Sequence, residues 1–161
     1  MSNEKRRLLI LGLGNPIVSD DALGFVVLDE LEKRINRPEV TLVATQTGGL
    51  SFIDLVAGYD VLIIIDAIKT GKHEPGTIVE FSPEEYAGSP RGAAVHDVSF
   101  FQALELGRRM NFKIPENIHI IAVEVVDTVN IREEMTPAVE RAVPAVVEKV
   151  TRLASDLGFG V

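Results

Sequence analysis

Apolar residues in this chain follow two patterns, short continuous runs and longer stretches with helical spacing. Continuous runs are typical of strands buried on both faces of a sheet. They predict strands over residues 7–13, Val40–Thr45, 61–66, Thr77–Phe81 and His119–Val125. Helical spacing bounded by glycine or proline predicts helices over residues 22–36, Leu50–Ala57, Asp97–Met110 and Thr136–Leu157. Because strands and helices alternate, we expect a three-layer α/β/α domain.

The order of these elements also predicts which strands are neighbours. We expect the first and third strands to pair, with the second strand outside the first. The segment Pro83–Gly92 is rich in Pro, Gly and Ser, which indicates a mobile loop. The chain contains no repeat, low-complexity tract or convincing domain boundary, so residues 1–161 are expected to form one domain.

Composition narrows the class of protein. Hydrophobic residues make up 46% of the 161 residues, which indicates a packed globular interior, and no apolar run is long enough for a membrane span. The absence of cysteine excludes disulfides, thiolate metal sites and a cysteine nucleophile. The net charge of −8 argues against nucleic acid as a partner. We expect a cytoplasmic, monomeric protein without a signal peptide.

The most informative segment joins the first predicted strand to the first predicted helix. Its glycines, Gly12 and Gly14, form a turn that delivers two adjacent carboxylates, Asp20 and Asp21, to the start of the helix. In open α/β sheets ligands bind at the carboxyl ends of the strands, where this turn lies. A carboxylate pair repels phosphate and attracts a cation, so we expect this turn to present acids to a metal.

The two aspartates are expected to have different roles. A carboxylate can cap the helix that begins near Ala22, because it accepts hydrogen bonds from free N–H groups and suits the helix dipole. We assign capping to Asp20, with the orientation of a catalytic water as the alternative. Asp21 is then the carboxylate that faces the ligand crevice.

Two further residues complete the candidate site. Asp66 ends the buried strand 61–66 and is expected at the switch point beside Asp20 and Asp21. Carboxylates gathered there would have raised pKa values unless a cation compensates. His96 follows the predicted loop and can swing toward the strand ends. An imidazole with two carboxylates suits nickel or zinc better than magnesium.

Three other polar residues are weaker candidates. We expect His73 to be exposed in a polar turn and His119 to pack on the flank of a strand. Glu124 lies inside an apolar strand, so it is either buried with a partner or close to the site.

Several common catalytic and nucleotide-binding motifs are missing. Ile17 stands where the dinucleotide fingerprint has its third glycine, and no Gly-Lys-Ser/Thr phosphate loop occurs. The sequence also lacks Gly-x-Ser-x-Gly and His-Glu-x-x-His, which argues against a serine hydrolase elbow and an ordinary zinc protease.

The ordered motifs resemble one known family, the nickel–iron hydrogenase maturation endopeptidases. The opening Gly12-Leu13-Gly14-Asn15 with Asp20-Asp21 and Gly24 is similar to the first motif of that family. The later matches are Thr47-Gly48-Gly49, Asp66-Ala67, His96, and Val123-Glu124 followed by Met135-Thr136-Pro137. The resemblance covers nearly the whole chain and implies a five-stranded mixed sheet of order 2-1-3-5-4, with the fourth strand antiparallel.

The resemblance also implies a reaction. Members of this family remove a C-terminal extension from the hydrogenase large-subunit precursor after nickel has been inserted. Asp21, Asp66 and His96 would be the catalytic, metal-contacting trio. Independently of the resemblance, we hypothesise that the loop 83–95 closes over the substrate tail and excludes bulk water. The nickel belongs to the substrate, so no tightly bound cofactor is expected. Many relatives have Glu in place of Asp21, Gly in place of Ala22 and Pro in place of Val125.

Two alternatives remain at this point. The run Gly12–Pro16 also resembles the opening of peptidyl-tRNA hydrolases, but those enzymes continue with glycine and carry an early catalytic histidine. Here Ile17 follows, and no histidine occurs before His73. The other alternative is a nickel-binding maturation factor without protease activity.

Overall fold

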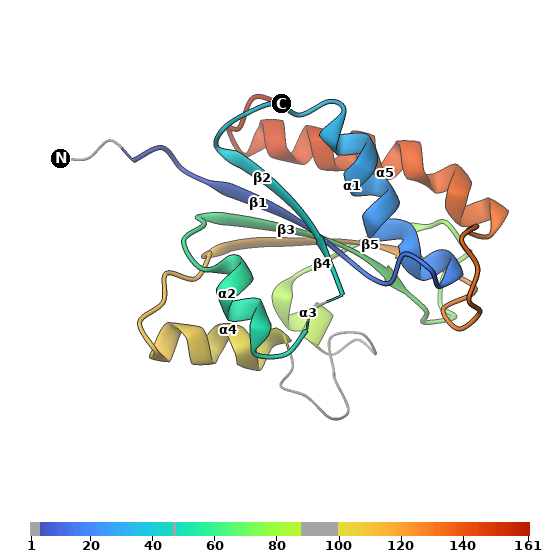
Figure 1. Ribbon diagram of the computed structural model, residues 1–161, viewed down its shortest axis with the longest axis horizontal. Helices are drawn as coiled ribbons and strands as arrows, with labels where there is room; N and C mark the ends of the chain where they lie inside the picture. The colour runs from blue at the N-terminus through green and yellow to red at the C-terminus, as the bar shows by residue number, and fades with distance from the viewer. Residues whose placement is uncertain (1–3, 47, 88–99) are drawn as a thin grey trace.

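A five-stranded mixed sheet runs through the middle of the molecule (Figure 1). The computed structural model describes residues 4–46, 48–87 and 100–161. The strands are β1 (Leu8–Leu13), β2 (Val40–Thr45), β3 (Val61–Ile68), β4 (Ile78–Phe81) and β5 (Asn117–Glu124). Their order is β2-β1-β3-β5-β4, and only β4 is antiparallel to its neighbour. The order and the antiparallel strand that the resemblance implied are confirmed.

Helices cover both faces of this sheet. Figure 1 shows α1 (Leu23–Glu32) and α5 (Pro137–Asp156) on one face. The helices α2 (Ser51–Val56), α3 (Pro83–Ala87) and α4 (Phe100–Arg109) cover the other. The predicted three-layer arrangement is therefore confirmed. Among the described residues, no helix has the length and apolarity needed to cross a membrane.

The central strands explain the continuous apolar runs in the sequence. Every residue of β1 and β3 is buried. Their side chains alternate between two cores, one facing α1 and α5 and one facing α2, α3 and α4. Because both faces of these strands are covered, neither face needs polar residues.

Several predicted boundaries differ from the structure, and three of the differences bear on the site. Strand β3 continues through Asp66 to Ile68, so Asp66 lies inside the strand and does not end it. Helix α3 occupies residues Pro83–Ala87, where we predicted a loop, and the rest of that predicted loop lies outside the described residues. The first helix ends at Glu32, and a short 3-10 helix, η1 (Ser19–Ala22), precedes it.

Candidate active site at the carboxyl edge of the sheet

The glycines of the opening motif allow β1 to pack closely on the segment that follows it. A Cβ atom at Gly12 would lie 2.6 Å from the carbonyl oxygen of Gly24. Gly14 has a φ of +147°, and a Cβ atom there would lie 2.0 Å from the carbonyl oxygen of Asp21. Only glycine fits such contacts. The glycines therefore hold η1 against the end of β1, which brings Asp21 to the edge of the sheet.

Asp66 lies at the same edge, on the neighbouring strand. Gly12 pairs with Ile65 in the parallel register, so Leu13 is level with Asp66. Gly14 follows at once and touches Asp21, and η1 contacts β3. The structure thus brings Asp21 and Asp66 to the meeting point of β1 and β3, where ligands bind in open α/β sheets.

The third member of the predicted trio, His96, lies outside the described residues. Among the residues that are described, no three histidine, aspartate or glutamate side chains are grouped to hold a metal ion. The described part of the site therefore supplies two carboxylates.

Asp66 is a fully buried carboxyl group that accepts hydrogen bonds from Tyr86 and Ala67. The Tyr86 hydroxyl donates to Oδ2 at 2.7 Å, and the backbone N–H of Ala67 donates to Oδ1 at 2.9 Å. Burial raises the pKa of Asp66 to about 7, although both hydrogen bonds oppose the rise. A raised pKa was expected from neighbouring carboxylates, but its largest cause is the loss of water. A cation near Asp66 would favour its charged form.

Tyr86 is a site residue that the sequence did not reveal. It lies on α3, where we predicted a loop, and only 2% of its surface is exposed. Its ring packs edge-on against Phe100 of α4, with 5.6 Å between ring centroids. Burial raises the pKa of Tyr86 far above its usual range, and the charge of Asp66 adds to the rise. Tyr86 therefore keeps its proton. Its hydroxyl donates a hydrogen bond to Asp66 and so orients the carboxyl group.

Asp20 has neither of its predicted roles. It lies within η1, and no side chain caps η1 or α1. Its buried carboxylate accepts the backbone N–H groups of Val126, Asp127 and Thr136, at 3.0, 2.9 and 2.7 Å. The Thr136 hydroxyl lies 2.9 Å from both carboxylate oxygens. Asp20 therefore fastens the β5–α5 connection to η1, and these donors engage both of its carboxylate oxygens.

The local backbone separates the two aspartates. A 3-10 helix has about three residues per turn, so consecutive side chains point roughly 120° apart.

Ser19, just before Asp20, has a φ of +40°, which is strained for a residue with a side chain. Its N–H donates to the carbonyl of Arg132 at 2.8 Å, and its hydroxyl to the carbonyl of Glu134 at 3.2 Å. These bonds to the β5–α5 connection hold the strained turn in place.

Replacing Asp20 with alanine is expected to lower the free energy of unfolding by about 3 kcal/mol or more. The change leaves the N–H groups of Val126, Asp127 and Thr136 without their acceptor. Urea unfolding followed by circular dichroism measures the loss.

Asp127→Ala is the matched control in the same connection. The Asp127 carboxylate also accepts hydrogen bonds, from the backbone N–H and side-chain amide of Asn130 and from the backbone N–H of Val129, and these bonds lower its pKa to about 2. These bonds are exposed, so water can replace the lost acceptor, and we expect a much smaller loss. Equal stability of Asp20→Ala and wild type would show that the buried bonds do not hold the connection.

Glu124 is buried with a partner, which is the first of the two alternatives that the sequence left open for it. The N–H of Thr70 donates to Oε2 at 2.8 Å, and the Thr70 hydroxyl donates to Oε1. Burial tends to raise the pKa of Glu124, but the hydrogen bonds from Thr70 and Gly71 and the nearby His73 bring it below the usual range. Glu124 therefore anchors the turn after β3. His73 is exposed in that turn, as predicted.

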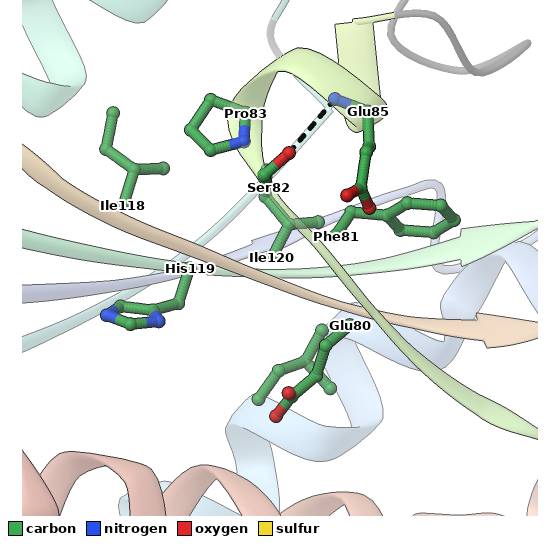
Figure 2. Close-up of a pocket in the computed structure, with 9 residues that line it drawn as sticks. Glu80, Phe81, Ser82, Pro83, Glu85, Ile118, His119 and Ile120 are labelled. Carbon is green, nitrogen blue, oxygen red and sulfur yellow. Dashed lines mark hydrogen bonds between the residues drawn. The ribbon is translucent and has the colours of Figure 1, made fainter.

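A pocket of about 320 Å³ at the β4–α3 junction is a poor candidate for the active site (Figure 2). It contains His119, whose buried Nε2 atom has no hydrogen-bond partner in the part of the chain that the structure describes. Burial lowers the pKa of His119, although Glu80 opposes this. Figure 2 shows His119 and Glu80 on one side of the strands and Glu85 on the other. Glu80 also pairs with Lys149 at 3.1 Å, so the polar groups do not converge.

The fold and the carboxylates together define the class: an α/β domain with two acidic residues at the carboxyl edge of its sheet. Residues 25–153 match the family model described as hydrogenase maturation protease. The chain belongs to the hydrogenase maturation protease family, and it is a peptidase. This assignment decides against the peptidyl-tRNA hydrolase and non-proteolytic alternatives.

Individual relatives agree with the family model. The chain is 29% identical to the hydrogenase 2 maturation protease of Escherichia coli, over 94% of this chain and 93% of that protein. It is 28% identical to the hydrogenase expression/formation protein HupD of Rhizobium leguminosarum, over 96% and 77%. Among solved structures, the hydrogenase maturating endopeptidase HybD of Escherichia coli superposes with a TM-score of 0.80 at 26% identity, covering 94% of each chain.

Proposed function

We propose that this chain is an endopeptidase that removes the C-terminal extension of a nickel–iron hydrogenase large-subunit precursor, and that it recognises the nickel already held by that substrate. The observation that supports this most directly is the placement of Asp21 and Asp66 at one edge of the sheet, in a member of this protease family. The absence of cysteine fits action in the cytoplasm.

The three residues of the proposed trio share one role, and Tyr86 supports one of them. Asp21, Asp66 and His96 contact the substrate's nickel and hold it beside the scissile amide. The metal supplies Lewis-acid polarisation of the carbonyl or activates water. Hydrolysis adds one water across the amide, leaving a new carboxylate on the large subunit and an amine on the released extension. Tyr86 is a positioning residue, because its hydroxyl fixes the carboxylate of Asp66.

The buried state of Asp66 suits contact with a transient cation. Without a cation, burial keeps the pKa of Asp66 near neutral, so its ionised form is destabilised. The arrival of nickel offsets this penalty and draws the carboxylate into its charged form. We therefore propose that the enzyme holds no tightly bound metal and that the substrate completes the site.

The test is a processing assay with nickel-loaded and nickel-free large-subunit precursor. We expect the nickel-loaded precursor to lose its extension and the nickel-free precursor to stay intact. Intact-mass spectrometry of the large subunit reports the cut directly. Equal cleavage of both precursors would contradict nickel recognition, and cleavage of neither would contradict the proposed function.

A further inference from the structure

Four large apolar side chains are exposed beside the carboxylate site. Ile17 is 52% exposed and lies in the β1–η1 connection. Val126, Val129 and Ile131 lie in the β5–α5 connection and are 45%, 76% and 79% exposed. We call these four residues the apolar rim. Single exposed apolar residues are ordinary, but a cluster of them marks an interaction surface.

Backbone pairing places two members of the rim side by side. Val18 and Arg132 form an isolated parallel bridge, in which Arg132 N–H donates to the carbonyl of Ile17 at 2.9 Å. In a parallel register the residues that precede two partners are also opposite each other and point to the same face. Ile17 and Ile131, which precede the two partners, therefore lie close together, and Val129 is two residues from Ile131.

The rim is held by buried and local hydrogen bonds. The N–H of Val126 donates to the buried carboxylate of Asp20 at 3.0 Å. The N–H of Val129 donates to the Asp127 carboxylate at 3.1 Å. A surface that is already ordered loses little conformational entropy when a partner covers it. The exposure of the rim is thus a fixed property of the fold.

The rim is continuous with the proposed active site. Ile17 and Asp21 belong to one short connection, whose η1 segment contacts β3, the strand that carries Asp66. Asp20, bonded to the rim through Val126, is the residue before Asp21. A folded protein that brings a peptide bond to Asp21 and Asp66 must lie against these connections.

We infer that the apolar rim is the docking surface for the folded body of the large-subunit precursor. The inference rests on the proposed function, because the precursor is the occupant only if it is the substrate. The matching surface on the precursor is an apolar patch close to the start of its C-terminal extension. Apolar contacts by the rim position the precursor so that its nickel and scissile bond meet the carboxylates.

The test is the double substitution Val129→Asp with Ile131→Asp. We expect the Kd for immobilised nickel-loaded precursor to rise about tenfold or more, because charges would be buried against an apolar patch. The same variant is expected to show a raised KM with kcat little changed, because the carboxylates are untouched. Biolayer interferometry measures the Kd, and the processing assay measures the kinetic constants.

The matched control is the double substitution Met110→Asp with Phe112→Asp. Met110 and Phe112 are 56% and 41% exposed and lie in the α4–β5 connection, at the other end of the sheet (Figure 1). We expect this variant to bind and process the precursor like wild type. Circular dichroism confirms that both double variants are folded.

The outcomes separate this inference from the proposed function. If wild type cleaves the precursor and the Val129/Ile131 variant binds it with an unchanged Kd, the inference of the docking surface is overturned and the proposed function stands. Wild type that binds the precursor but does not cleave it would contradict the proposed function alone. Sedimentation of the free protein tests a second copy as the occupant. Dimers that the Val129/Ile131 substitutions dissociate would overturn the inference.

Discussion

Replacing Asp21 with asparagine is expected to lower kcat/KM for processing of nickel-loaded precursor by about 10²–10⁴-fold. Asparagine keeps the size of the side chain, and the closest approach of Asp21 to Gly14 is through the backbone carbonyl of Asp21. The fold should therefore survive. What is lost is the negative charge that the proposal places against the substrate's nickel. The time course of large-subunit shortening, followed by intact-mass spectrometry, gives the rate.

Three further variants test this result. Asp29→Asn makes the same chemical change on the exposed side of α1 and is expected to leave processing unchanged. Asp21→Glu restores the charge with one more methylene, as in many members of the family that the chain resembles, and is expected to retain part of the activity. His96→Ala removes the third proposed member and should match the loss in Asp21→Asn. Full processing by both Asp21→Asn and His96→Ala would contradict the proposal that Asp21, Asp66 and His96 contact the nickel.

The sequence predicted the layers of the fold because buried strands leave a strong local signal. Val40–Thr45 matched its strand at both ends, and Thr136 was found one residue before α5 begins at Pro137. The order of the elements also predicted the pairing of β1 and β3, and so the edge where Asp21 and Asp66 lie. These features follow from burial of side chains that are close in sequence.

Features set by contacts between distant residues could not be predicted from local sequence. Asp20 was expected to cap the next helix, as an aspartate at that position often does. Its actual partners, Val126, Asp127 and Thr136, are more than 100 positions away along the chain. Tyr86 was missed for a related reason, because its five-residue helix is too short to show a periodic pattern. Asp66 was taken for a strand end, since an acid inside a buried strand contradicts the usual burial preference.

Replacing Asp66 with asparagine is expected to abolish processing and yet stabilise the folded protein at about pH 8, by on the order of 2–4 kcal/mol. In the folded state burial raises the pKa of Asp66 from 3.8 to about 7. Below pH 3.8 the group is protonated in both the folded and the unfolded chain. As the pH rises toward 7, the unfolded chain releases its proton first, so wild-type stability falls. Asparagine has no charge to bury, so the variant avoids this loss.

The gain should depend on pH in a way that a packing effect would not. Urea unfolding across the range from about pH 4 to pH 8 should show the two proteins converging at the acid end and diverging toward the neutral end. Tyr86→Phe is the complementary control: it removes the hydroxyl that donates to Oδ2, so the pKa of Asp66 should rise further. The steep fall in stability should then extend to higher pH than in wild type. A stability difference between Asp66→Asn and wild type that is constant with pH would mean that Asp66 is not a buried acid with a raised pKa. In that case, the idea that the substrate's nickel draws Asp66 into its charged form would lose its physical basis.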